Sequence, residues 1–179
     1  MNHLEAFRYV HTLLFDVDGV FTNSELLVLE SGQLLRSMSV RDGLAIKLAI
    51  RAGLRVAIIT GGASQGVVSR MRALGIKDVF SGVEDKLATY EAYRNRHQLE
   101  SHDHILYMGD DLPDYPVMRR VGLPTCPADA VPEIRRIAQY VSPFVGGSGC
   151  VRDVIEKVLK LQGRWPQFAE TELWTAADD

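Results

Sequence analysis

The chain has little cysteine and no long apolar run. Its 179 residues include two cysteines, Cys126 and Cys150, which form no CxxC pair. So few thiols exclude a disulfide-built scaffold and make a reducing cytoplasm the expected setting. No apolar stretch approaches the roughly 20 residues that a membrane helix needs. The N-terminus, MNHLEAFRYVH, lacks the continuous apolar segment of a signal peptide. We therefore expect no membrane association.

An excess of positive charge is also missing. The chain has 20 basic and 23 acidic residues and a formal net charge of −3. Proteins that bind the phosphate backbone of nucleic acid are normally basic, so no nucleic-acid partner is expected. Apolar residues make up 46% of the chain and charged residues 24%, which excludes a disordered or low-complexity protein. The length predicts one domain over residues 1–162, followed by a tail over 163–179.

Short apolar runs alternate with helix-length amphipathic segments. The sequence predicts strands at His11–Phe15, Val56–Ile59 and Ile105–Met108, with weaker candidates at Val79–Phe80 and Tyr140–Val141. It predicts helices at Asp42–Ala52, Ser64–Leu74, Glu84–Gln98, Pro113–Val121, Val131–Ala138 and Cys150–Leu161. Continuous apolar strands suit a sheet that is covered on both faces. The pattern therefore predicts an α/β fold with a mainly parallel sheet and helices on both faces.

Two segments break this alternation. Glu25–Val40, within an insertion at residues 21–40, has the pattern of a β-hairpin turning at Ser31-Gly32. A lone hairpin is marginal in water, so it either lies on the chain's own sheet or pairs with other subunits. We favour pairing, because both of its faces carry Leu or Val. The second segment is the tail from Gly163, where Trp165, Phe168, Leu173 and Trp174 indicate either a frayed terminus or a docked one.

Polar residues follow three of the predicted strands. Asp16-Val17-Asp18-Gly19 comes after the first strand, and Thr60-Gly61-Gly62 after the second. Gly109-Asp110-Asp111 and, one turn later, Asp114 come after the third, and Lys86 opens the helix that precedes it. Ligands of α/β sheets bind beyond the carboxyl ends of the strands. One crevice is therefore expected to receive carboxylates, a hydroxyl and an ammonium group.

This set of groups suits phosphoryl transfer. Clustered carboxylates repel one another unless a cation lies among them, and oxygen-only ligands favour Mg²⁺. The metal and Lys86 would neutralise a phosphate, while Thr60 would donate a hydrogen bond to it. One aspartate can attack phosphorus to form an aspartyl-phosphate, and a second aspartate two residues on can exchange protons with the leaving alcohol and with water.

The order of these groups resembles one family. A signalling receiver domain uses similar parts, but there the acidic pair comes first; here the DxD pair comes first and the acidic pair last. This order resembles the haloacid dehalogenase (HAD) phosphohydrolases, with LLFDVDGVFT similar to the first motif. The resemblance implies a Rossmann-like HAD fold with Asp16 as nucleophile and Asp18 as acid/base. Thr60 then matches the second motif, Lys86 the third, and GDDLPD the fourth.

The same resemblance implies a metal site and supporting residues. Mg²⁺ would lie between Asp16, the backbone carbonyl of Asp18, and Asp110. Asp111 and Asp114 would support this site, and Arg152 is a further candidate for a supporting role.

A narrower resemblance concerns the substrate. The stretches SVRDGLAIKLA, GDDLPDYPVM and GGSGCVRDV are similar to the phosphatases of 3-deoxy-D-manno-octulosonate (KDO) 8-phosphate. That group lacks a large cap domain, which agrees with the about 35 residues between the first motif and the second strand. It also implies a homotetramer assembled through the hairpin, with a neighbour's tail over the active site. The substrate, a small anionic sugar phosphate, would contact Ser39, Val40, Arg41, Asp42, Gly43, Lys47, Gly61, Arg70 and Lys86.

One departure leaves the substrate open. KDO 8-phosphate phosphatases have an arginine directly after the Thr-Gly of the second motif, where this chain has Gly62. Relatives that act on nine-carbon acids (KDN or N-acylneuraminate 9-phosphate) include some that also lack it. KDO 8-phosphate is the first substrate hypothesis and a nine-carbon acid phosphate the alternative. The non-enzymatic alternative is a catalytically idle subunit of the same fold.

Overall fold

The computed structural model describes residues 3–166 and places six strands in one parallel sheet. The strand order is β5-β4-β1-β6-β7-β8. The strands are β1 (Thr12–Phe15), β4 (Arg55–Thr60), β5 (Asp78–Ser81), β6 (Ile105–Met108), β7 (Leu123–Cys126) and β8 (Tyr140–Val141). The chain moves outward from β1 to β5 and then resumes on the other side of β1. Such a reversal of direction is where ligands of α/β sheets bind.

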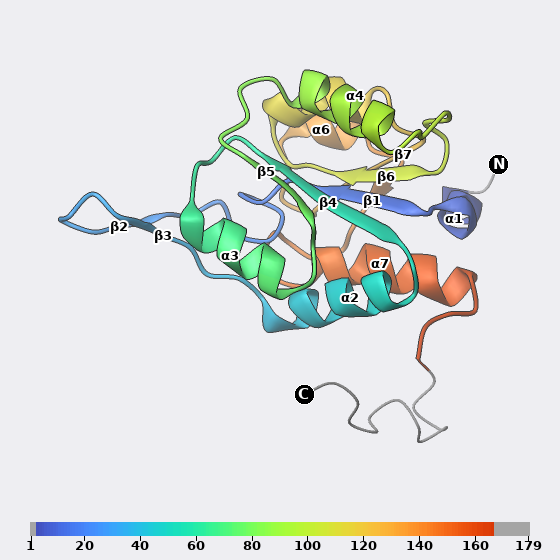
Figure 1. Ribbon diagram of the computed structural model, residues 1–179, viewed down its shortest axis with the longest axis horizontal. Coiled ribbons are helices and arrows are strands. Elements are labelled where there is room, and N and C mark those ends of the chain that lie inside the picture. The colour runs from blue at the N-terminus through green and yellow to red at the C-terminus, as the bar shows by residue number, and fades with distance from the viewer. Residues whose placement is uncertain (1–2, 167–179) are drawn as a thin grey trace.

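Helices cover both faces of this sheet (Figure 1). The helices of one layer are α2 (Val40–Arg51), α3 (Gln65–Ala73) and α7 (Cys150–Leu161), and those of the other are α4 (Lys86–Arg96), α5 (Tyr115–Met118) and α6 (Pro132–Ile137). The strands are buried on both sides: Leu13 and Phe15 of β1 join the core beneath α2 and α7, while Leu14 joins the core beneath α4. Two short N-terminal turns, α1 (His3–Ala6) and η1 (Phe7–Tyr9), precede β1. The predicted α/β architecture is confirmed.

The structure adds one strand to the predicted elements and corrects one predicted helix. The sequence pattern did not indicate β7, because Pro124 lies inside it and proline normally argues against an inner strand. The predicted helix Pro113–Val121 was wrong as a single element: a 3₁₀ turn, η2 (Leu112–Asp114), precedes the short α5. Asp111 and Asp114 form a capping box around that turn, which tightens the start of the segment.

The hairpin forms a sheet of its own. Its strands β2 (Leu27–Val28) and β3 (Leu34–Leu35) pair with each other and with no strand of the main sheet. The interpretation that the hairpin lies on the chain's own sheet is therefore wrong. It projects from the body of the molecule in Figure 1, and Leu27 and Val28 are 62% and 65% exposed. Only this hairpin and α2 lie between β1 and β4, so no large cap domain is present there.

The end of the described chain packs on α7. Trp165 contacts the core cluster beneath that helix, and the Arg152 guanidinium lies 5.5 Å from its ring centroid. Phe168, Leu173 and Trp174 lie outside the described residues, so the predicted docking of the tail remains a prediction. Within residues 3–166, no helix combines the length and apolarity needed to cross a membrane.

Candidate active site

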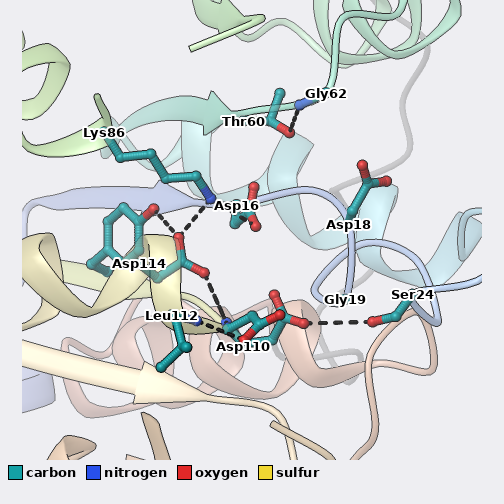
Figure 2. A network of polar contacts seen from close by, with 12 residues as sticks. Asp16, Asp18, Gly19, Ser24, Thr60, Gly62, Lys86, Asp110, Leu112 and Asp114 are labelled. Carbon is teal, nitrogen blue, oxygen red and sulfur yellow. Dashed lines mark hydrogen bonds and ion pairs between the residues drawn. The ribbon is translucent and has the colours of Figure 1, made fainter. Parts of the chain in front are cut away.

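Three polar side chains converge at the carboxyl ends of β1, β4 and β6. Asp16 follows β1 directly, Thr60 is the last residue of β4, and Asp110 stands two residues after β6. Because β1 pairs in parallel with both other strands, these ends meet at one edge of the sheet (Figure 2). They line a cleft of about 430 Å³. The other predicted site residues along this cleft are Asp18, Gly61, Lys86, Asp111 and Asp114.

Lys86 reaches the floor of the cleft from the first turn of α4. The Asp85 carboxylate caps that helix by accepting a hydrogen bond from the Ala88 amide. Lys86 Nζ then lies 2.9 Å from Asp16 Oδ2 and 2.7 Å from Asp114 Oδ1, and its side chain is only 6% exposed. Burial alone would lower the pKa of Lys86, but the negative charges of Asp16 and Asp114 raise it overall, so the side chain keeps its positive charge. It can therefore act on an anion that enters the cleft.

Asp114 connects several parts of the site. Its Oδ1 accepts hydrogen bonds from Lys86 Nζ and from the Tyr107 hydroxyl, both at 2.7 Å. Its Oδ2 accepts hydrogen bonds from the backbone amides of Asp110, at 3.0 Å, and Asp111, at 3.4 Å. Both oxygens of this fully buried carboxylate are thus engaged by the protein. The arrangement holds the loop after β6 against α4.

The carboxylates in the cleft fit a divalent cation. Oxygens of Asp16, Asp110 and Asp114 lie within 4.8 Å of one another. Among the described residues, Asp16 Oδ1 is buried and has no hydrogen-bond partner. Carboxylate oxygens without His or Cys suit a hard cation such as Mg²⁺. The oxygens of Asp114 already receive four protein donors, so Asp16 and Asp110 are the better ligand candidates.

Asp16 and Asp110 both have raised pKa values, which a nearby positive charge would lower. The pKa of Asp16 is raised to about 7, first by burial and then by the negative charge of Asp114, while Lys86 partly offsets both effects. Burial, followed by the charge of Asp16, raises the pKa of Asp110 to about 8. A bound cation would favour the ionised forms and would release protons as it binds.

Gly19 allows the first motif to approach the loop after β6. Its φ of +86° lies in the left-handed region, and a Cβ atom there would lie 1.9 Å from Asp110 Oδ2. Any other residue would push the Asp110 carboxylate away from Asp16. The glycine that follows the DxD pair therefore serves the geometry of the carboxylate cluster.

Asp18 has a partner that the sequence did not indicate. Arg36, which follows β3, donates from Nε to Asp18 Oδ1 at 2.6 Å and from a terminal nitrogen to Asp18 Oδ2 at 3.1 Å. The Asp18 side chain is 36% exposed, against 9% for Asp16, so it lies nearer the mouth of the cleft. Only the return of the hairpin toward the first motif could have indicated Arg36, and sequence spacing alone does not reveal that contact.

The other predicted substrate contacts lie outside this cleft. Ser39 caps α2, and Val40–Gly43 form its first turn. The buried Asp42 carboxylate accepts a hydrogen bond from the Arg152 amide at 2.8 Å, while Lys47 is exposed one turn further along α2. Arg70 lines a second cavity, between the hairpin and α3. The structure thus groups the predicted catalytic residues but not these contacts, whose roles remain predictions.

Comparison with known proteins gives a consistent result along the chain. The 3-deoxy-D-manno-octulosonate 8-phosphate phosphatase of Escherichia coli K12 is 36% identical over 155 residues, covering 87% of this chain and 82% of that protein. No protein-family model matches the chain.

Solved structures agree with this similarity. A protein of Legionella pneumophila, described as a HAD superfamily (subfamily III A) hydrolase, superposes with a TM-score of 0.87 at 36% identity, covering 90% of this chain and 88% of its own. The 3-deoxy-D-manno-octulosonate 8-phosphate phosphatase of Moraxella catarrhalis, solved with magnesium, phosphate and KDO, gives a TM-score of 0.88 at 29% identity, with coverages of 93% and 95%. The likeness thus extends over nearly the whole of each chain.

Proposed function

Because this chain belongs to the 3-deoxy-D-manno-octulosonate 8-phosphate phosphatase family of HAD-superfamily hydrolases, we propose that it hydrolyses the phosphomonoester of a small sugar acid. KDO 8-phosphate is the first candidate, and a nine-carbon acid 9-phosphate is the alternative. The observation that carries this proposal is the buried Asp16 carboxylate: Lys86 holds one of its oxygens, and the other has no partner among the described residues.

The proposed roles follow from the positions of the side chains. Asp16 is the nucleophile and would attack with the carboxylate oxygen that the metal does not hold. Lys86 and Thr60 bind phosphoryl oxygens on two sides of it. Asp16, the backbone carbonyl of Asp18, and Asp110 would hold Mg²⁺, with Asp111 and Asp114 in support. When bound, Mg²⁺ supplies positive charge that offsets the phosphate and the clustered carboxylates.

The reaction then proceeds in two steps. A carboxylate oxygen of Asp16 forms a bond to phosphorus while the ester oxygen leaves and takes a proton from the Asp18 carboxyl group. Asp18, now ionised, accepts a proton from a water molecule whose oxygen attacks phosphorus. The bond between Asp16 and phosphorus breaks, and inorganic phosphate and the free sugar acid result. The greater exposure of Asp18 suits a group that must meet both the leaving alcohol and water.

The proposed substrate class agrees with the surroundings of the cleft. The Moraxella relative was solved with KDO and phosphate bound. Among the proposed contacts, which are Ser39–Gly43, Lys47, Gly61, Arg70 and Lys86, the basic residues Arg41, Lys47, Arg70 and Lys86 would supply positive charge for a carboxylate and a phosphate. The resemblance to the KDO 8-phosphate phosphatases implies an arginine at position 47; the Lys47 found there keeps the charge but loses bidentate geometry.

A substrate panel tests this function. We expect purified protein with Mg²⁺ to release phosphate from KDO 8-phosphate with a kcat/KM at least about tenfold higher than from nine-carbon acid 9-phosphates. Adding a chelator in excess of Mg²⁺ should abolish release, and restoring Mg²⁺ should recover it. A preference for the nine-carbon acids would select the alternative substrate. If no member of the panel releases phosphate, the proposed function is wrong.

We also propose that the hairpin assembles a homotetramer. The two-stranded sheet of the hairpin has no partner within the described chain. Five apolar side chains in and beside it are 39–65% exposed: Leu26, Leu27, Val28, Leu34 and Leu35. Contiguous exposed apolar surface of this kind marks association sites. Light scattering at micromolar concentration should give four chain masses, and Leu27→Asp should give smaller species with unchanged circular dichroism. A wild-type monomer under these conditions would contradict the proposal.

A further inference from the structure

Arg36 forms an unusual contact for a residue on a projecting hairpin. Its side chain is only 7% exposed, and two of its nitrogens meet the two oxygens of Asp18. This two-pronged arrangement is the geometry in which a guanidinium recognises a carboxylate most specifically. The structure therefore contains a preformed carboxylate-binding group beside the candidate active site.

The contact conflicts with the role proposed for Asp18. Arg36 engages both Oδ1 and Oδ2, so the leaving alcohol must share an Asp18 oxygen with the guanidinium unless the guanidinium shifts. A shift becomes favourable when a second carboxylate replaces the one that Arg36 gives up. The leaving portion of a sugar-acid phosphate supplies such a group.

Gly62 leaves space for this exchange. A Cβ atom at this position would lie 2.9 Å from Asp18 Oδ2 and 3.1 Å from a terminal nitrogen of Arg36. Any larger residue would therefore press against both partners of the ion pair. Because position 62 has no side chain, the guanidinium and a substrate group can share the space beside Asp18.

Arg36 and its partner Asp18 line different cavities. Asp18 lines the acidic cleft, whereas Arg36 lines the neighbouring cavity of about 610 Å³ between the hairpin and α3. Arg70 lines this second cavity as well, and its described lining contains no Asp or Glu. It is thus suited to an anionic group that extends from a phosphate held in the acidic cleft.

We propose that Arg36 is a specificity-determining residue that binds the carboxylate of the substrate's leaving portion and thereby releases Asp18. The proposal rests on the phosphatase function proposed above and adds to it a means of choosing substrates. A sugar phosphate with a carboxylate draws Arg36 into the second cavity and frees an Asp18 oxygen for the leaving alcohol. A sugar phosphate without a carboxylate leaves Arg36 on Asp18.

Steady-state kinetics on a matched pair of substrates test the proposal. The pair is KDO 8-phosphate and the same sugar phosphate with its carboxylate reduced to an alcohol. Arg36→Ala should lower kcat/KM for the acid by roughly 10–100-fold, the loss expected for a charge-assisted bidentate contact. For the reduced analogue kcat/KM should stay within about threefold or rise. Arg36→Lys keeps the positive charge but cannot form the bidentate contact. Its kcat/KM for KDO 8-phosphate should therefore lie between those of wild type and Arg36→Ala.

A control variant and a binding measurement distinguish a carboxylate contact from a general loss of activity. Arg72→Ala removes an exposed arginine of the same helix as Arg70 that lines neither cavity, and should leave both substrates unaffected. Equal losses on both substrates, or no loss on either, would overturn the proposal while leaving the phosphatase function intact. If wild type releases no phosphate, titration calorimetry with KDO decides: weaker binding to Arg36→Ala supports the carboxylate contact, and unchanged binding overturns it.

Discussion

Replacing Asp16 with asparagine is expected to lower the rate of phosphate release by on the order of 10⁴-fold or more, as loss of a covalent nucleophile does in other hydrolases. The amide has nearly the shape of the carboxylate but cannot form the acyl-phosphate bond. The measurement is single-turnover phosphate release with Mg²⁺ and the best substrate of the panel. Acid-quenched samples should contain phosphorylated wild-type protein and no phosphorylated variant.

The control for Asp16→Asn is Asp103→Asn. Asp103 is an exposed aspartate before β6, outside the acidic cleft, and its replacement should leave the rate within about twofold of wild type. Circular dichroism and thermal unfolding must show that both variants fold. A folded Asp16→Asn protein that retains more than about a hundredth of wild-type activity would contradict the nucleophile assignment.

Replacing Lys86 with methionine should have the second large effect, on stability as well as activity. Methionine keeps much of the volume of the side chain but leaves Asp16 and Asp114 without the ammonium that lies 2.9 and 2.7 Å from them. Removing one partner from a buried ion pair costs about 3–5 kcal/mol of the free energy of unfolding. Urea unfolding in the presence of a chelator measures this loss. Phosphate release should also fall by at least about 10²-fold, because the phosphoryl group loses a positive contact.

The stability loss of Lys86→Met should depend on pH. The pKa of Asp16 is already raised to about 7, mainly by burial, and Lys86 opposes that rise. Without Lys86 the pKa of Asp16 moves higher, so the folded state binds a proton that the unfolded state has released. Its stability then falls as pH increases through this range, and the difference from wild type should be larger at about pH 8 than at about pH 6.

An exposed ion pair gives the matched comparison for Lys86→Met. Lys160 is 59% exposed and pairs with Glu156 at 2.7 Å on α7. Lys160→Met should cost less than about 1 kcal/mol, with little dependence on pH between about 6 and 8. If the two lysine variants lose equal stability, the buried cluster does not depend on Lys86 in the way described.

The sequence predicted the central strands of the sheet and the grouping of the catalytic candidates for one physical reason. Parallel strands bring their carboxyl ends to one edge, so residues directly after β1, β4 and β6 must meet. Asp16, Thr60 and Asp110 stand at those positions, and the structure places all three along one cleft. The continuous apolar runs of these strands also indicated a sheet covered on both faces.

What the sequence did not reveal depends on contacts between distant segments. The sequence did not predict β7 because Pro124 argues against an inner strand, whereas in the structure β7 pairs with β6 on one side and β8 on the other. Asp114 was predicted only as a supporting residue, and its link to Tyr107 and Lys86 requires three elements to be in position. Arg36 reaches Asp18 because the hairpin folds back, a geometry that no spacing rule gives. Local patterns thus predicted the elements, and long-range packing determined their partners.

The location of Arg36 has a consequence for how the protein would behave as its concentration changes. Arg36 follows β3 directly, on the same hairpin whose exposed Leu27 and Val28 we propose as the contact between subunits. Subunit contact would then hold the root of the hairpin, and with it the guanidinium, in a fixed position. Dilution below the dissociation constant of the assembly would loosen selectivity for acids, while Asp16 and Lys86, held by the main sheet and α4, would keep their chemistry. The preference for acids over other sugar phosphates, and with it kcat/KM for the acids, would then depend on how much protein is present.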